Sequence, residues 1–440
     1  MAHEQEIDFP VDEGTIDFIQ HRLPFKAEFI QVRPWVDKKR IVSHMSSKWH
    51  MGSTPGAVVR VCGSVTNSNH DALEEVLEGI AKAAHATHAW LFSTGLDFGI
   101  ASVLGQALSR NRHKCNSPLI GVASWDSVQG HNQILKDAKG MPAMPGDKRI
   151  YVDQMPDDNF STVQLQADHT HFILVGTRED KPLPADGKSA EAQLLANRKR
   201  SFEFSHSLEA AIIEQQTQDG MDHSPRVLYV IAGDKTTLEE ILTYLKNGNG
   251  MVLLAVATGG LAAALGEFMD TGVVPDAWAG SKVHFEQVKE LNAAGSSSKA
   301  QGPKITSAST ALLDPSARPT NSIVQTSTSS FAEDVCKSIL EAVLSQAHTV
   351  ELRVRFAVAW DDEKLLQREL NSLPTWDVKQ RSDVLREALQ QALELEAEES
   401  VRVCMANAAP IKEIDLLALC EYHIRTRAHV PCLSLDRHED

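Results

Sequence analysis

The chain has 440 residues, of which 42% are hydrophobic, so it can bury a sizeable core and its size predicts two or three domains. Its 43 basic and 59 acidic residues give a formal net charge of −16, which disfavours nucleic acid and anionic membranes as partners. The six cysteines are scattered without a C-x-x-C pair, which argues against structural zinc or a disulfide framework. The acidic N-terminus lacks the features of a secretory signal and predicts a cytoplasmic protein.

Residues 1–50 carry few apolar runs and are expected to form an irregular N-terminal arm. From 51 to 290, apolar strands alternate with glycine turns and amphipathic helices. Such alternation predicts a doubly wound α/β domain, in which a parallel sheet is covered on both faces. The expected strands are 57–65, 89–92, 119–125, 171–176, 226–233 and 251–257, and the expected helices include 71–86, 100–110 and 208–218.

Three stretches of this domain depart from the simple alternation. Residues 136–160 are expected to form a surface loop, and 180–207 a polar insertion. Residues 251–269 are apolar for nearly the thickness of a membrane. Glycines interrupt this stretch after 257 and alanine dominates its second half, so we expect a strand, a turn and a helix. The sequence therefore predicts no membrane insertion.

The last third of the chain differs in composition. Residues 291–330 are rich in Ser, Thr, Pro and Gly and are expected to form a flexible linker. Residues 331–440 follow as a small all-α region without strand signals. The expected helices there are 331–346, 350–372, 378–397 and 399–407.

Small residues follow four of the predicted strands, at the sheet edge where open α/β folds bind ligands. Backbone N–H groups and helix N-termini at such positions can hold a phosphate. The sequence therefore predicts a nucleotide-type site at this edge. The small residues are Gly63 and Ser64; Ser93, Thr94, Gly95 and Gly99; Gly233 to Thr237; and Thr258, Gly259 and Gly260.

Other candidates for chemistry favour structural interpretations. His169 and His171 have the spacing of a metal-binding pair, but no third ligand lies nearby in the sequence, so packing and hydrogen bonding are expected. Cys62 is interpreted as a small buried hydrophobe rather than a reactive thiol. No G-x-S-x-G or H-E-x-x-H motif occurs, and we assign no catalytic residue or metal ligand.

Several segments resemble one family in order and spacing. Residues 89–108 read AWLFSTGLDFGIASVLGQAL and resemble the W-I-x-T-G-G-x-x-x-G-V-x-x-x-x-G-E-A pattern of melastatin-type transient receptor potential (TRPM) channels. Residues 168–176 (DHTHFILVG) resemble the N-H-S-H-F-I-L-V segment of those channels, and 352–376 resembles a segment of their helical region. The resemblance covers roughly residues 25–430. It implies a Rossmann-like SLOG domain followed by the TRPM helical region.

The resemblance also implies a function and a set of site residues. The chain would be the cytoplasmic regulatory region of a TRPM-like, calcium-permeable cation channel, assembled as a homo-oligomer (a tetramer) through the helical region or a channel core. It would not be an enzyme, and its ligand would be ADP-ribose or an adenine nucleotide. The implied contacts come from Ser93, Thr94, Gly95 and Gly99, with further loops from Gly63, Ser64, Gly233, Thr237, Thr258, Gly259 and Gly260.

Departures from the family pattern leave two alternatives open. Leu261 stands where the family has an arginine, so Arg198 and Arg200 are assigned to replace it, and Asp234 stands in a glycine-rich loop. One alternative is a lonely-guy-like phosphoribohydrolase, because RVCGSV (60–65) and Glu240 match parts of the motifs of those enzymes. The other is a structural assembly domain whose pocket has decayed.

Overall fold

The structure is a computed structural model of the whole chain. It describes residues 9–19, 25–51, 55–65, 68–110, 117–137, 139–152, 162–176, 190–218, 224–246, 250–297, 304–307, 331–347, 349–373, 378–394 and 397–407. Most of the predicted linker and the end of the predicted all-α region lie outside these residues. The chain divides into two compact units, Met1–Gln346 and Ala347–Asp440.

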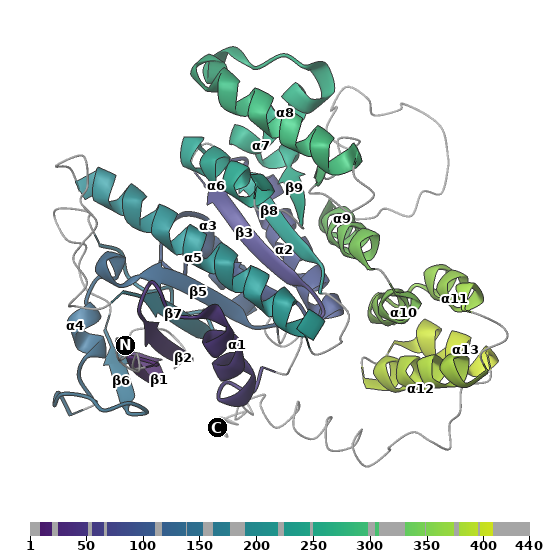
Figure 1. Cartoon of the computed structure of the whole chain (residues 1–440), viewed down its shortest axis with the longest axis horizontal. Coiled ribbons are helices and arrows are strands. Elements are labelled where there is room, and N and C mark those ends of the chain that lie inside the picture. Colours follow the sequence, from purple (N-terminus) through teal and green to yellow (C-terminus); the bar gives the residue numbers. More distant parts are fainter. Residues whose placement is uncertain are drawn as a thin grey trace, which may run out of the picture. The chain divides into compact units, whose positions relative to one another are not determined.

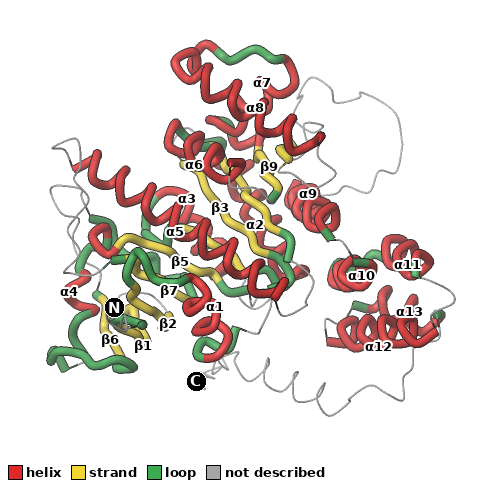
Figure 2. The backbone as a smooth tube through the Cα atoms, viewed as in Figure 1, coloured by secondary structure: helices red, strands yellow, loops and turns green. Residues whose placement is uncertain are grey.

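The strands of the described residues form one ten-stranded sheet in the first unit. Figures 1 and 2 show its strands lying side by side. Its order is β10-β9-β8-β3-β4-β5-β7-β2-β1-β6. All neighbouring strands are parallel except β1 and β2. The doubly wound α/β fold is thereby confirmed, with all six predicted strands in place. The strands are β1 (Asp12–Phe18), β2 (Phe25–Val32), β3 (Val58–Ser64), β4 (Trp90–Ser93), β5 (Leu119–Ser124), β6 (Lys148–Tyr151), β7 (His171–Val175), β8 (Arg226–Ala232), β9 (Met251–Ala255) and β10 (Lys304–Ser307).

Helices cover both faces of this sheet (Figure 1). One face carries α1 (Lys38–Ser47), α5 (Ala190–Gln218), α6 (Lys235–Lys246), α7 (Gly260–Thr271) and α8 (Lys282–Ser297). The other face carries α2 (His70–Thr87), α3 (Gly99–Arg110) and α9 (Phe331–Gln346). The short helix α4 (His131–Ile134) lies beside β6.

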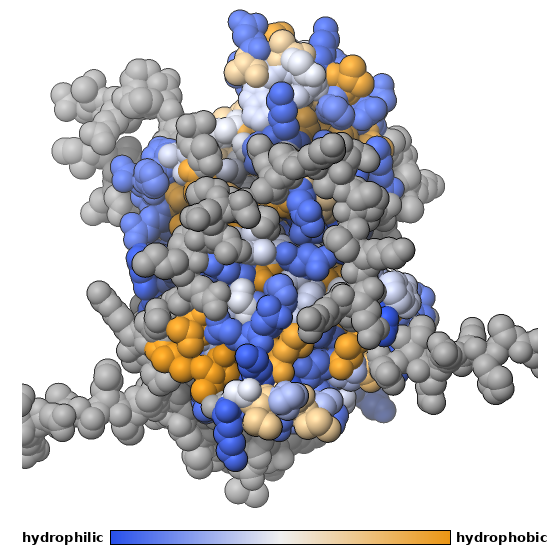
Figure 3. Space-filling view, turned by 90° about the vertical axis from the view of Figure 1, so that its left-hand side faces the viewer, coloured by the Kyte–Doolittle hydropathy of each residue, from blue (hydrophilic) through white to orange (hydrophobic). Residues whose placement is uncertain are grey.

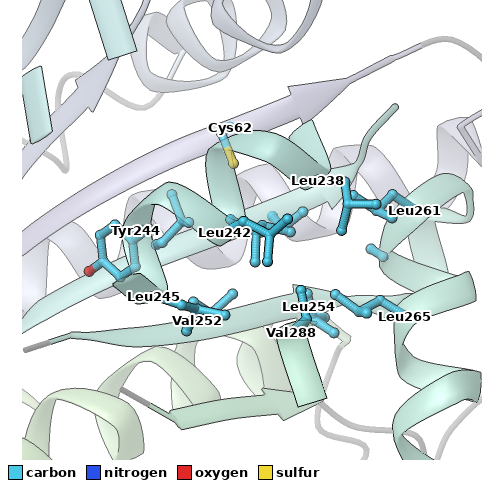
Figure 4. Packing of buried hydrophobic residues seen from close by; sticks show 14 of the residues in the cluster. Cys62, Leu238, Leu242, Tyr244, Leu245, Val252, Leu254, Leu261, Leu265 and Val288 are labelled. Carbon is cyan, nitrogen blue, oxygen red and sulfur yellow. The ribbon is translucent and has the colours of Figure 1, made fainter. Parts of the chain in front are cut away.

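The core under α6 illustrates how the sequence specifies these layers. Successive residues of a strand point to opposite faces, so Leu228 and Val230 of β8, two positions apart, both face α6 and α7. On α6, Leu238, Leu242 and Leu245 recur at helical spacing and form one buried stripe. Figure 4 shows this stripe facing β9, with Cys62 of β3 pointing toward the same helix. Each such leucine stabilises the fold by about 1.5–3 kcal/mol through burial of apolar surface.

The N-terminal region corrects one expectation from the sequence. Residues 12–18 and 25–32 form paired strands of the sheet, not an irregular arm. Ile16 and Phe18 of β1 are buried, whereas their neighbours along the strand are only partly buried. A half-polar strand of this kind near the edge of a sheet has no continuous apolar run, which is why the pattern resembled a loop.

Two other expected irregular stretches contain regular structure. Helix α5 begins at Ala190, inside the stretch 180–207 that was expected to be a polar insertion. The stretch expected to be a surface loop at 136–160 contains β6, which pairs with β1. Residues 153–161 and 177–189 lie outside the described residues.

The first unit continues past the linker expected at 291–330. Strand β10 pairs with β9 in parallel register, and α9 packs on α2. The contact with α2 is close, because a Cβ added at Gly79 would lie 2.6 Å from the carbonyl oxygen of Ala332. The helix at 331–346 therefore belongs to the sheet unit, not to the all-α region with which it was grouped.

The second unit consists of helices over its described residues, as expected for this part of the chain. They are α10 (Val350–Ala359), α11 (Glu363–Ser372), α12 (Val378–Glu394) and α13 (Glu398–Ala406). The single helix expected over 350–372 is broken at Asp361, whose φ is 53°. The Asp361 carboxylate accepts a hydrogen bond from the Ser400 backbone N–H at 2.7 Å, so the break also holds the start of α13.

Exposed apolar residues occur at several separate places along the chain. Phe98 and Met144, for example, are each about two-thirds exposed. In Figure 3, orange residues gather in one group at the lower left of the side in view, and smaller orange spots lie among blue residues elsewhere. Among the described residues, no helix combines the length and apolar character needed to cross a bilayer.

Candidate functional site

The order of the strands creates a switch point between β3 and β8. From β3 the chain passes through α2 to β4 on one side, whereas β8 lies on the other side of β3 and leads through α6 to β9. The loops after β3 and β8 thus leave adjacent strands toward opposite faces of the sheet. In open α/β sheets, the crevice between two such loops is where ligands bind.

Three of the four predicted loops come together at this point. The backbone N–H of Asn69, at the start of α2, donates to the Thr258 carbonyl at 3.2 Å. The Leu261 N–H donates to the Gly233 carbonyl at 3.2 Å, and the Ala232 N–H donates to Thr258 Oγ1 at 2.7 Å. The loops after β3, β8 and β9 are therefore neighbours, as the sequence predicted.

These loops pack closely against one another. A Cβ added at Gly260 would lie 2.9 Å from the Gly233 carbonyl oxygen, and Gly260 has a φ of +57°. Ala232 has a φ of 47°, a conformation that L-residues with a Cβ rarely adopt. Strained backbone of this kind concentrates at functional sites. The glycines here permit contact between protein segments, and this close packing leaves little room between the loops after β8 and β9.

Arg198 of α5 lies at the start of α6, where its guanidinium contacts two carboxylates and a hydroxyl. Its Nε and Nη2 donate to the two carboxylate oxygens of Glu240 at 2.8 and 3.2 Å. Nη2 also donates to Thr237 Oγ1 at 3.2 Å, and Nη1 lies 3.5 Å from Asp234 Oδ2. The exposed fractions of the Arg198, Glu240 and Asp234 side chains are 22%, 7% and 47%. We call Arg198, Asp234 and Glu240 the exit cluster.

Burial and the carboxylates of the exit cluster shift the pKa of Arg198 and of the nearby Cys62 thiol. Burial would lower the pKa of Arg198, but Glu240 and Asp234 raise it above its ordinary value, so the guanidinium stays charged. Burial and then the Glu240 charge raise the pKa of the Cys62 thiol well above its ordinary value. Cys62 is therefore a protonated, buried side chain, in agreement with its interpretation from the sequence.

Asp234 caps helix α6. Its Oδ1 accepts from the Thr237 backbone N–H at 2.9 Å and from Thr237 Oγ1 at 3.0 Å. A negative group at this end of a helix is stabilised by the helix dipole and by the N–H groups that lack partners within the helix. The position that would suit a phosphate is thus occupied by a carboxylate of the chain itself.

The fourth predicted loop, after β4, is covered by another segment of the chain. Ser93 Oγ lies 2.6 Å from His169 Nε2 and is buried. Gly95 accepts from the Gln166 N–H at 2.9 Å, and its left-handed backbone brings it against Gly121. Ser93 and Gly95 therefore contact protein, and Thr94 between them is partly buried. At Gly99, where α3 begins, an added Cβ would meet no atom within 4 Å.

The two histidines of the H-x-H pattern have different partners. His169 Nδ1 lies 2.9 Å from Gln166 Oε1, while the His171 ring lies 4.6 Å from the ring of Trp49. Burial lowers the pKa of His171 to about 4. The imidazoles do not converge, and within the described residues no group of three His, Cys, Asp or Glu residues could hold a metal ion.

Arg200 contacts a different part of the chain from the part that Arg198 contacts. Its Nη1 is 3.9 Å from Asp126 Oδ2, in the turn after β5, whereas Arg198 contacts α6.

Glu240 also borders a hollow of about 50 Å³ between α5 and α6. Ligand pockets for small molecules measure about 300–1,000 Å³. This hollow is therefore too small to hold a nucleotide as it stands.

A second ionic cluster lies buried beneath α5, and the sequence reasoning missed it. Glu209 of α5 contacts Arg60 of β3 at 2.6 Å and Arg226 of β8 at 3.0 Å. Arg226 Nη2 also lies 3.1 Å from His206 Nδ1. All four side chains are buried. The available signal was an arginine inside the apolar run of β3 and a glutamate among the apolar residues of α5.

Charge balance inside this buried cluster sets the pKa of its members. Burial would raise the pKa of Glu209, but Arg60 and Arg226 lower it, so the carboxylate is charged. Burial, followed by the charge of Arg226, lowers the pKa of His206 to about 4, so the ring is neutral at pH 7. We call Arg60, His206, Glu209 and Arg226 the buried cluster.

Comparison with known proteins identifies the family. The family described as SLOG in TRPM matches residues 27–293, which is more than half of the chain. The chain belongs to this family. Its SLOG domain contains β2 to β9, and the exit cluster and the buried cluster both lie inside it.

The relatives of the chain carry the names of channels. Human transient receptor potential cation channel subfamily M member 5 is 25% identical over 410 residues, which cover 88% of this chain and 32% of that protein. Subfamily M member 1 of Mus musculus is 28% identical over 54% of this chain and 14% of its own length. A transient receptor potential channel of Caenorhabditis elegans is 25% identical over 60% of this chain and 12% of its own length. The chain thus spans a third or less of these curated relatives.

Proposed function

We propose that the chain is the cytoplasmic regulatory region of a TRPM-like cation channel. The SLOG domain and the names of the relatives support a role in such a channel. In this proposal the channel conducts calcium, and the all-α unit makes contacts within a homotetramer. Regulation then requires that a ligand bind two states of the assembly with different affinity.

We further propose that the SLOG domain binds ADP-ribose or an adenine nucleotide at the switch point between β3 and β8. The observation that carries this proposal is Arg198, a charged guanidinium held beside the N-terminus of α6 and only partly buried. A guanidinium next to a helix N-terminus is well suited to a phosphate group. The remaining contacts would come from Gly63, Ser64, Gly233, Thr237, Thr258, Gly259 and Gly260.

A second candidate function is an assembly module that needs no ligand. The covered turn after β4 and the close packing of Gly233 against Gly260 favour it. Because the turn after β4 is covered, the nucleotide proposal depends less on the contacts predicted there, which are those of Ser93, Thr94, Gly95 and Gly99. The two candidate functions differ in one respect: nucleotide binding requires that a phosphate reach Arg198 in the exit cluster, whereas an assembly module does not.

Isothermal titration calorimetry of the full chain with ADP-ribose, AMP and ATP distinguishes these functions. We expect binding that R198A abolishes and that S93A and R200A leave within about twofold, because the latter two residues contact protein at other strand ends. Absence of heat and of any thermal shift with all three compounds would leave the assembly module.

The phosphoribohydrolase alternative needs a separate assay. Both carboxylate oxygens of Glu240 accept from Arg198, and the named relatives are channels, so we expect no release of adenine from AMP. Chromatography of AMP incubated with the chain tests this expectation. Release of adenine that is lost in E240A would reverse it.

A further inference from the structure

The exit cluster suggests how access to the site is controlled. We propose that Asp234 is a built-in competitor for phosphate: it occupies the N-terminus of α6 and shares Arg198 until a nucleotide phosphate displaces it. This inference rests on the proposed nucleotide site and adds the residue that sets its affinity.

The two carboxylates of the cluster are held differently. Glu240 makes a bidentate contact with Arg198 and is 7% exposed, so it anchors the guanidinium. Asp234 is 47% exposed and lies 3.5 Å from Arg198, at the long end of the contacts in the cluster. An exposed ion pair of this length contributes little net stability, so solvent or another anion can replace it. Asp234 is therefore held more weakly by Arg198 than Glu240 is, and its other contacts are the two hydrogen bonds that its Oδ1 accepts from Thr237.

A phosphate in the place of Asp234 would satisfy the same donors. Asp234 Oδ1 already accepts from the Thr237 N–H and hydroxyl, and its Oδ2 faces Arg198 Nη1. Phosphate oxygens accept hydrogen bonds in the same geometry and carry more charge. With Asp234 in place, however, the phosphate meets a like charge at close range, which opposes binding. The residue at 234 thus determines how well the site accepts a phosphorylated ligand.

The exit cluster also couples the ligand to helix packing. Arg198 belongs to α5, Glu240 belongs to α6, and Asp234 is the residue just before α6. Displacement of Asp234 removes the contact between α5 and the start of α6 and leaves the anchor at Glu240. The ligand therefore changes the α5–α6 contact that borders the hollow beside Glu240.

The test uses substitutions that keep side-chain size in the full chain. D234N removes the charge but keeps an oxygen that can cap α6, so we expect ADP to bind about tenfold more tightly, while affinity for adenosine, which lacks phosphate, stays unchanged. E240Q removes the charge and one of the two oxygens that hold Arg198, so we expect ADP to bind about tenfold more weakly. D270N makes the same charge change at an exposed residue of α7 and should leave both affinities unchanged.

Calorimetry with ADP and adenosine measures these effects, and thermal melting verifies that each variant is folded. The inference is supported if D234N binds ADP more tightly than the wild type does and D270N does not. It is also supported if D234N binds ADP and the wild type does not. Equal ADP affinity in wild type and D234N overturns the role of Asp234 but leaves the nucleotide site standing. If neither the wild type nor D234N binds ADP, this inference is wrong; the proposed nucleotide function is wrong as well only if ADP-ribose, AMP and ATP also give no heat.

Discussion

Helix α5 contributes to two arginine–carboxylate clusters that differ in charge balance and in exposure. The buried cluster has two guanidiniums for one carboxylate, and all of its members are shielded from water. The exit cluster has one guanidinium for two carboxylates, and Asp234 is half-exposed. The same pair of chemical groups can therefore fix a helix to a sheet at one place and remain exchangeable at another. The difference lies in access to solvent.

The strongest test of this contrast removes the only carboxylate of the buried cluster. E209Q leaves Arg60 and Arg226 buried without a counter-charge, so we expect the free energy of unfolding to fall by about 3–5 kcal/mol. Urea unfolding followed by tryptophan fluorescence measures this loss. The control is E214Q, which removes an exposed contact with Lys39 and should change stability by less than about 1 kcal/mol. If E209Q and E214Q lower the free energy of unfolding equally, the buried cluster stabilises the fold no more than an exposed ion pair does.

The buried cluster also predicts a dependence of stability on pH. The pKa of His206 is about 4 in the folded chain and 6.5 ordinarily, so the unfolded chain binds more protons between these values. Stability therefore falls as the pH drops from 6.5 toward 4, by about 3 kcal/mol for this residue. Urea unfolding at several pH values should show a smaller decline in H206Q than in wild type. H284Q, at an exposed position on α8, should retain the full decline.

The smallest stability effect is expected at the exit cluster. R198A should lower the free energy of unfolding by about 1–2 kcal/mol, because Arg198 is 22% exposed but its removal leaves the carboxylate of Glu240, which is 7% exposed, without this partner. We also expect R198A to abolish the proposed nucleotide binding. R110A, which removes an exposed contact with Glu74, serves as the matched control for both measurements. A loss above about 3 kcal/mol in R198A would make the exit cluster a structural anchor like the buried one.

The fold was predictable where apolar runs were continuous. Six strands and most helices of the sheet unit lie within a few residues of their expected positions, because buried parallel strands leave a clear pattern. The strand β1 was missed because buried and partly buried residues alternate along it, and β2 because Lys26, Glu28 and Gln31 interrupt its apolar residues. The first half of α5 was missed because its many polar and charged residues, Arg198 among them, leave no apolar stripe that would indicate a helix.

The candidate site was predictable only in part. The glycine turns indicated which strand ends meet, and three of these ends do meet. Arg198 was assigned as a replacement for the missing arginine and does lie at the switch point, but its pairing with Glu240 could not be read from residues 42 positions apart in the chain. The covering of Ser93 by His169 depends on a contact over 76 positions. Such long-range pairings come from the topology of the sheet and not from local sequence.

The contact between α9 and α2 has a practical consequence for work on the isolated domain. A fragment ending at residue 293, where the family match stops, would lack both α9 and β10. The apolar surface of α2 around Gly79 and the open edge of β9 would then face water, and both kinds of surface promote self-association. Expression of this domain alone is best designed to end beyond Gln346.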